Sequence, residues 1–180
     1  MTTLTPESAI PSANESEKPK SRRRIAREFV VQGIYQWRVA GGTASAIEQQ
    51  LRESETFKYV DEKHFSQVLQ GVLSDVDTLD QQLQPCLDRP SRELSPVEYA
   101  ILLSSTFELA SHPEIPYRAI INEAIELART FGGSDGYKYV NGVLDKLARQ
   151  LRPEEFAAGR AARKAAQQSD ATDQNDIDSN

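Results

Sequence analysis

The sequence has very little cysteine, histidine, methionine or tryptophan: it contains one Cys, two His, one Met and one Trp in 180 residues. A single cysteine, Cys86, excludes an intrachain disulfide framework. Together with only His64 and His112, it does not complete a structural zinc site. No apolar run approaches the roughly 18 residues of a membrane span, and residues 1–20 lack the architecture of a signal peptide. We therefore expect a cytoplasmic chain without a metal site.

Sequence patterns typical of catalysis are absent as well. The chain contains no GxxxxGK[ST] or GxGxxG phosphate loop and no HExxH or GxSxG motif. Cys86 lies between Pro85 and Leu87 with no activating His or Lys close in sequence, which favours a structural or loop thiol. The sequence predicts neither an enzyme nor a cofactor-binding protein.

Charge is distributed unevenly along the chain. The net charge of −6 comes from 21 basic and 27 acidic residues and argues against a uniformly basic, histone-like protein. Residues 18–27 (KPKSRRRIAR), however, contain six bases and no acid, whereas residues 28–153 contain 12 bases and 18 acids. Such a basic segment attracts polyanions, above all nucleic-acid phosphates. A solvated helix start or a chance cluster is the alternative interpretation.

Both ends of the chain lack the apolar periodicity of a folded segment. Residues 1–20 are rich in Thr, Ser, Pro and Glu, and residues 157–180 have Ile177 as their only large apolar side chain. Neither segment buries enough surface to offset the entropy of ordering. We expect a disordered N-terminal extension over 1–20, a folded core over 21–153 and a disordered acidic tail over 154–180. The mean hydropathy of −0.56 is then partly a property of the tails.

The spacing of apolar residues predicts helices throughout the folded core. Apolar residues recur at helical spacing over 21–40, with Ser21 as N-cap and Gly41–Gly42 as a stop signal. A capping box from Ser45 opens a short helix to about residue 52. Steps of 3 and 4 between apolar residues predict one helix of about six turns over 61–84, with His64 at its surface or boundary.

Three further helices follow. Ser95, Pro96 and Glu98 are start signals for a central, mostly buried helix to about residue 111. Pro116 opens the next helix, through Phe131, and the last runs from Asp135 to about residue 151, where Pro153 stops it. No segment alternates with period 2. The sequence predicts an all-α fold, a compact bundle of about six to seven helices in two small packed subdomains, about 21–88 and 89–153.

Several side chains are candidates for reading RNA. Arginines at the start of a helix can bind successive phosphates of a nucleic-acid backbone. Aromatic or amide side chains can stack on unstacked bases or form hydrogen bonds with them. The first helix offers Gln32, Tyr35 and Trp37, and the last offers Tyr137, Lys138 and Tyr139. A core position is the alternative for each aromatic residue, and it is the favoured interpretation for Trp37.

Four stretches together resemble the NusB family of bacterial transcription antitermination factors. They are RRRIAREFVVQGIYQW (22–37), FSQVLQGVLSDVDTLD (65–80), IPYRAIINEAIELARTFG (115–132) and KYVNGVLDKL (138–147). Their order and spacing span residues 21–153. The resemblance implies a two-subdomain helical fold without catalysis or cofactor. It also implies binding of boxA, a short linear RNA element, together with NusE, a ribosomal protein of the small subunit, in RNA polymerase complexes with other Nus factors.

The resemblance also implies roles for particular residues. Phosphate contacts are expected from Arg22, Arg23, Arg24 and Arg27, and Gln32 is expected to contact RNA. The start of the last helix is expected to reach RNA through Asp135, Lys138 and Tyr139, with Asp135 weakening the interaction. Tyr35 and Glu98 match positions that face NusE. The chain departs from the family near Leu103, where relatives often carry a basic residue, so one contact is expected to be missing.

Two alternatives come from other functional classes. A NusB-like domain of an RNA methyltransferase would need a downstream α/β domain with a Gly-rich cofactor loop, and the sequence instead reaches residue 180 in a polar segment. A protein-interaction module without an RNA role is the second alternative, against which the basic segment argues. A monomer and a homodimer through apolar helix faces are both consistent with the sequence.

Overall fold

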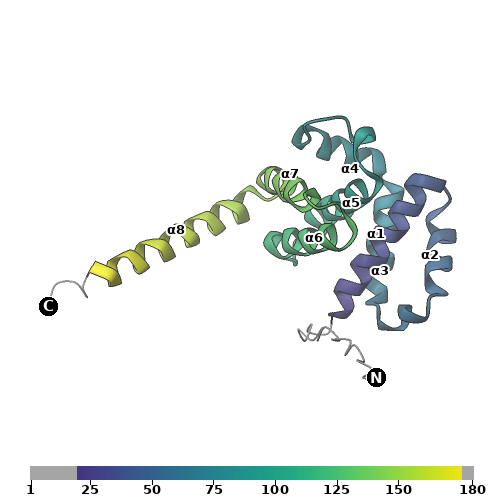
Figure 1. Cartoon of the computed structure of the whole chain (residues 1–180), viewed down its shortest axis with the longest axis horizontal. Helices are drawn as coiled ribbons and strands as arrows, with labels where there is room; N and C mark the ends of the chain where they lie inside the picture. Colours follow the sequence, from purple (N-terminus) through teal and green to yellow (C-terminus); the bar gives the residue numbers. More distant parts are fainter. Residues whose placement is uncertain (1–19, 176–180) are drawn as a thin grey trace, which may run out of the picture.

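The computed structural model describes residues 20–175, with side chains to residue 168, and within this range it contains α- and 3-10 helices and no strand (Figure 1). This confirms the all-α prediction, with eight α-helices where six to seven were expected. The α-helices are α1 (Arg22–Ala40), α2 (Ala44–Arg52), α3 (Glu62–Ser74), α4 (Val76–Leu83), α5 (Pro96–Ser111), α6 (Tyr117–Phe131), α7 (Gly136–Leu151) and α8 (Pro153–Asn175); the 3-10 helices are η1 (Glu55–Tyr59), η2 (Gln84–Cys86) and η3 (Ser91–Glu93).

Helix α5 forms the centre of the bundle, as its composition predicts. It packs against α1, α3, α4, α6 and α7, and ten of its residues are buried. Ser95 caps it by accepting a hydrogen bond from the Glu98 N–H at 3.2 Å. A helix that is apolar on most of its circumference is stable in water only when neighbours cover it on all sides. Leu103 is fully buried here, so its position offers no surface for the basic contact expected in relatives.

An aromatic cluster joins α1, η1 and α3. The rings of Phe29, Phe57 and Phe65 contact one another edge to face, with centroids 5.1–6.3 Å apart. Edge-to-face pairs are favoured by the ring quadrupoles and add to the burial of their large apolar area. The cluster holds the start of α3 beside the N-terminal half of α1, where the basic segment begins.

The long helix predicted over 61–84 is two helices. The backbone leaves the helical conformation at Asp75, which separates α3 from α4. Spacing does not reveal the break, because Val72, Val76 and Leu79 keep helical intervals on both sides of it. The N-cap of α2 is also Thr43 and not Ser45, since the Thr43 hydroxyl accepts from the Ala46 N–H.

The C-terminal segment corrects the expected boundary at residue 153. Pro153 begins α8, which extends away from the bundle (Figure 1). Arg152 explains how this helix is attached: its buried guanidinium donates to the backbone carbonyl oxygens of Glu108, Leu109, His112 and Ile115. Cations stabilise the unpaired carbonyls at a helix C-terminus. Phe156 then packs on Tyr117 with ring centroids 5.4 Å apart.

The N-terminal extension over 1–19 and residues 176–180 lie outside the described residues. The expected subdomain boundary near residue 88 falls in the loop between η2 and η3. Buried side chains on both sides of this loop belong to one hydrophobic core.

Candidate nucleic-acid interface

The first turn of α1 consists of three arginines. Ser21 caps the helix through a hydrogen bond from the Arg24 N–H to its hydroxyl at 3.2 Å, and the first turn contains no acidic residue. The N-terminus of a helix has a partial positive charge that favours anions and disfavours cations. Arginines at this position therefore do not stabilise the helix. Together with the dipole, they make the helix start attractive to anions.

Arg22 and Arg23 are exposed and are tied to the start of α3. Arg22 donates to the Val60 carbonyl oxygen at 3.0 Å, and Arg23 Nε donates to Asp61 Oδ2 at 3.3 Å. Burial alone would raise the pKa of Asp61, but hydrogen bonds from the His64 N–H and Arg23 outweigh it and lower the pKa. Both guanidiniums keep further N–H groups that these contacts do not use.

Arg24 connects α1 to the C-terminal half of α6. Its guanidinium lies 3.2 Å from Glu126 and 3.8 Å from Glu123. Glu126 also binds Arg129 at 3.0 Å, and the Arg129 guanidinium lies over the Tyr137 ring, 4.7 Å from its centroid. This series of contacts joins the start of α1 to the start of α7. The two segments predicted to contact RNA therefore lie at one edge of the bundle.

Arg27 does not belong to this edge. The residue is buried, and its Nε donates to both Glu108 carboxylate oxygens at 3.1 Å. His64 Nε2 approaches Glu108 Oε1 at 2.5 Å from the other side. The expectation that Arg27 contacts phosphate is inconsistent with this placement, because its charge is already paired in the core. His64 is likewise buried and not a surface residue as expected.

The start of α7 contacts the loop before α5. The Tyr139 hydroxyl donates to Asp88 Oδ1 at 2.9 Å, and Arg89 lies over the Tyr139 ring at 5.4 Å. Hydrogen bonds from Arg89 and Tyr139 lower the pKa of Asp88 to about 2. Burial, followed by the hydrogen bond to Asp88, raises the pKa of Tyr139. The phenol stays protonated, and one edge of its ring is fixed by a carboxylate.

Asp135, Lys138 and Glu98 lie around the same turn. Lys138 Nζ lies 2.9 Å from Asp135 Oδ1, and both side chains are exposed. Glu98 and Asp135 line one shallow hollow with Arg89 and Tyr139. The structure thus brings Glu98, expected on the partner-facing surface, close to the residues expected to bind RNA.

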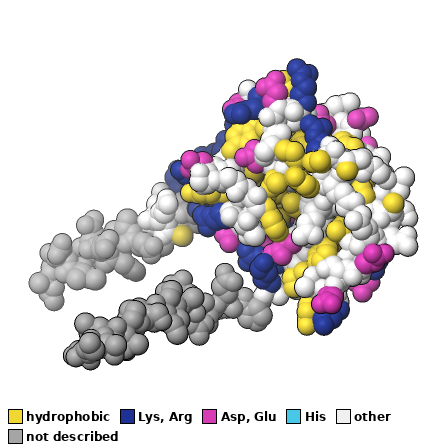
Figure 2. All heavy atoms as spheres, turned by 45° about the vertical axis from the view of Figure 1, so that its right-hand side comes forward, with side chains coloured by type: hydrophobic (Ala, Val, Ile, Leu, Met, Phe, Trp, Pro, Cys, Tyr) yellow, Lys and Arg dark blue, Asp and Glu magenta, His cyan; other side chains and the backbone are white. Residues whose placement is uncertain are grey.

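Gln32 and Tyr35 face other directions. Gln32 lines a groove with Ser54, Thr56 and Tyr59, on the η1 side of α1. Tyr35 is 42% exposed and Val39, one turn later, is 59% exposed. Figure 2 shows apolar side chains reaching the surface on the side of the molecule that bears α1 and α2. An apolar patch of this kind is typical of a protein contact.

Arg89 and Arg129 were not anticipated from the sequence. Arg129 lies in the last turn of α6, three residues before Gly132, where a basic residue is ordinarily explained by the helix dipole. Arg89 lies in a loop bracketed by Pro85 and Pro90, which gives no indication of what the loop contacts. Only the packing of this loop and of α6 against α7 brings both arginines beside tyrosine rings.

Other kinds of site find no support in the described part of the chain. Residues 20–168, whose side chains the structure describes, contain no group of three His, Cys, Asp or Glu side chains able to hold a metal ion. The same part has no helix that is both long and apolar enough to span a bilayer. Cys86 is buried, and burial raises the pKa of its thiol, so the thiolate that a nucleophile requires is disfavoured.

Comparisons with known proteins identify the family of this chain. A NusB protein of Nitrosospira multiformis, described as a transcription antitermination protein, is 61% identical over 132 residues, covering 73% of this chain and 84% of the relative. Its counterpart in Paraburkholderia xenovorans is 55% identical over 141 residues, covering 78% and 98%. A solved structure of T. maritima NusB superposes with a TM-score of 0.65 at 28% identity, covering 78% and 99%. A model of the NusB family matches residues 24–149, and the chain belongs to the NusB family of transcription antitermination proteins.

Proposed function

We propose that this chain binds boxA-type single-stranded RNA during ribosomal RNA transcription, through the surface formed by the starts of α1 and α7 and the end of α6. The observation that carries the proposal is the series Arg24, Glu126, Arg129 and Tyr137, which joins arginines and an aromatic ring from three helices. Arginines bind phosphates, and half-buried tyrosines stack on unpaired bases. We call this series, with Arg22, Arg23, Asp135, Lys138 and Tyr139, the basic edge.

Glu123 and Glu126 affect how strongly the arginines of the basic edge bind phosphate. Both carboxylates are partly exposed and pair with Arg24, so they compete with phosphate for its guanidinium. Exposed ion pairs are worth at most about 1 kcal/mol, and RNA phosphates can replace them. The acids also restrict the side chains of Arg24 and Arg129 before RNA binds, which reduces the entropy lost on binding.

A basic protein partner fits the remaining surface. Residues 28–153 have a net charge of −6, from 12 bases and 18 acids, and charge complementarity favours a basic protein. The exposed Tyr35 and Val39 supply apolar contact area. We propose NusE, a ribosomal protein of the small subunit, as this partner, in a complex with RNA polymerase and other Nus factors. Glu98 is then a contact at the border between RNA and partner.

A titration of boxA-type RNA into the full chain, with and without NusE at two salt concentrations, tests the proposal. If the chain binds RNA, the binding should weaken with salt. A plot of the logarithm of the binding constant against the logarithm of the salt concentration should have a slope of about −0.7 for each phosphate neutralised. The Arg22→Ala/Arg23→Ala/Arg24→Ala variant should bind more weakly and with a smaller slope. Absence of binding under every condition, or binding unchanged in this variant, would support the interaction module without an RNA role.

A further inference from the structure

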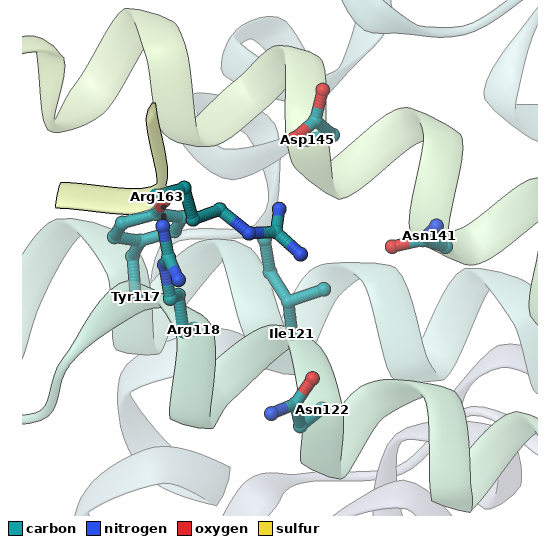
Figure 3. Close-up of a pocket in the computed structure, with 7 residues that line it drawn as sticks. All are labelled: Tyr117, Arg118, Ile121, Asn122, Asn141, Asp145 and Arg163. Carbon is teal, nitrogen blue, oxygen red and sulfur yellow. Dashed lines mark hydrogen bonds between the residues drawn. The ribbon is translucent and has the colours of Figure 1, made fainter. Parts of the chain in front are cut away.

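A second polar hollow lies beside the α6–α7 pair, at the first two turns of α6 and the middle of α7. It has a volume of about 360 Å³ and is bordered by α6, α7 and the first half of α8 (Figure 3). The residues around it include Arg118 and Asn122 from α6, Asn141 and Asp145 from α7, and Arg163 from α8. None of these residues belongs to the surface described above.

Arg163 and the two asparagines are open to a ligand. The Arg163 side chain is exposed, and no described residue lies in hydrogen-bond or ion-pair contact with it. Figure 3 shows its guanidinium reaching from α8 into the space between α6 and α7. Asn122 and Asn141 are exposed on the facing helices. Asp145, the one acid in the hollow, is paired with Arg149 at 2.8 Å, which offsets its repulsion of an anion.

Arg118 holds α8 so that Arg163 lies over the hollow. Its Nη2 donates to the Gly159 carbonyl oxygen at 2.7 Å, and its Nε donates to the Tyr117 hydroxyl at 3.1 Å. A Cβ at Gly159 would lie 2.8 Å from the same Nη2. Glycine at this position therefore allows α8 to approach α6 closely, and the placement of Arg163 depends on that approach.

The hollow and the basic edge lie along the same seam. On α6, Arg118, Asn122 and Arg129 follow one another at helical intervals, and on α7 Tyr137, Asn141 and Asp145 are each four residues apart. Residues at such intervals share one helix face. From Tyr137 to Asp145 the distance along the helix axis is about 12 Å. A nucleic-acid strand leaving Tyr137 along this seam would reach the hollow directly.

We infer that the hollow is a phosphodiester site for RNA that continues beyond the boxA-type element, with Arg163 binding the phosphate and Asn122 and Asn141 contacting sugar or base. This inference rests on the proposed function. The alternating charge and amide groups match a strand that presents both phosphates and polar base edges. A guanidinium presents its N–H groups in a fork that fits phosphate oxygens.

The inference is tested by fluorescence anisotropy with the full chain and two sets of RNA. One RNA contains only the boxA-type element, and the others continue from it on the 5′ or the 3′ side. Wild-type protein should bind one of the extended RNAs more tightly than the short one. Arg163→Ala should remove this gain, reduce the salt slope for that RNA by about 0.7 and leave the short RNA unaffected. Gly159→Ala, which displaces Arg118, should reduce the gain as well.

Lys146→Ala is the matched control, since Lys146 is an exposed base on α7 that lies toward Cys86 and away from the hollow. It should leave both affinities unchanged. If the short RNA binds but no extension adds affinity, or if Arg163→Ala weakens both RNAs equally, the inference is overturned and the proposed function stands. If no RNA binds, both are overturned. Inorganic phosphate that shifts the Arg163 side-chain NMR signal where extended RNA does not would identify a small-anion site and also overturn it.

Discussion

Arg27 Nε donates to both carboxylate oxygens of Glu108 at 3.1 Å, which fixes α1 to α5 inside the core. Arg23, one helical turn earlier, is exposed and forms a surface ion pair with Asp61. Two arginines of the same basic segment therefore have different tasks: Arg27 maintains the bundle, and Arg23 remains available to a ligand.

Arg27→Ala should destabilise the protein far more than Arg23→Ala. Removing Arg27 leaves the Glu108 carboxylate buried without the guanidinium that pairs with it, and breaking a buried ion pair costs about 3–5 kcal/mol. Removing Arg23 disrupts an exposed pair worth at most about 1 kcal/mol. Urea unfolding of both variants measures the difference. Equal losses of unfolding free energy would contradict the structural role of Arg27.

The Glu108 pair should also make stability depend on pH. Burial alone would raise the pKa of Glu108, but the hydrogen bond from His64 and the charge of Arg27 outweigh it and lower the pKa. A carboxyl with a lower pKa in the folded state contributes stability above its unfolded pKa and loses it as pH falls through the folded pKa. Unfolding free energy should therefore decrease below about pH 4.5.

The Glu108→Gln variant separates this group from the other carboxyls. Its amide cannot ionise, so the decrease in stability on acidification should be smaller than in wild type, while stability at neutral pH is already lower. Denaturant unfolding at a series of pH values gives both quantities. An acid dependence identical to that of wild type would show that Glu108 does not contribute to it.

Asp135→Asn should tighten RNA binding. The substitution removes an acid from the basic edge and releases Lys138 from a 2.9 Å ion pair. Exposed charges interact by about 0.2–1 kcal/mol, so the gain should be at most about fivefold. Asp77→Asn is the matched control, because it changes the net charge by the same amount at an exposed position on α4 that does not belong to the basic edge. Anisotropy at fixed salt should show a gain for Asp135→Asn alone; weaker or unchanged affinity would argue against a repulsive role.

Gly71→Ala should destabilise the junction of α3 and α5. A Cβ at Gly71 would overlap the Phe107 ring, whereas a Cβ at Gly142 on α7 would meet nothing within 4 Å. Overpacking of this kind costs about 1–3 kcal/mol, while alanine in place of an unhindered helical glycine gains about 0.5–1 kcal/mol. Thermal unfolding should therefore move in opposite directions for the two variants, and parallel shifts would refute the packing argument.

Helix type, order and most boundaries could be predicted because they depend on local signals. Ser21, Ser95 and Gly41 act at caps as predicted, since a cap needs only its neighbouring backbone. The break at Asp75 and the helix after Pro153 could not be predicted. The helix after Pro153 is attached through tertiary contacts, in which Arg152 binds carbonyls from residues 108–115, and such contacts leave no periodic pattern in the sequence. The break at Asp75 does not interrupt the helical spacing of the apolar residues around it.

The candidate site was predicted in part for the same reason. A run of basic residues is visible in the sequence itself, and the structure places Arg22, Arg23 and Arg24 in the first turn of α1, with Arg22 and Arg23 exposed and Arg24 partly buried. Their binding to RNA stays a prediction. Arg27 shares their composition, but its burial is decided by Glu108, which is 81 residues away in sequence. Arg129 and Arg89 become candidates only when the fold places them on tyrosine rings.

Amide NMR mapping during titration with boxA-type RNA tests the central claim most directly, because it reports where RNA binds without a substitution. If RNA binds at the basic edge, the largest shifts should occur at residues 21–24, around Arg129 and over 135–139, with little change on α2 or around Val39. Shifts concentrated on α2 and α3, with the starts of α1 and α7 unaffected, would contradict the assignment of RNA binding to the basic edge.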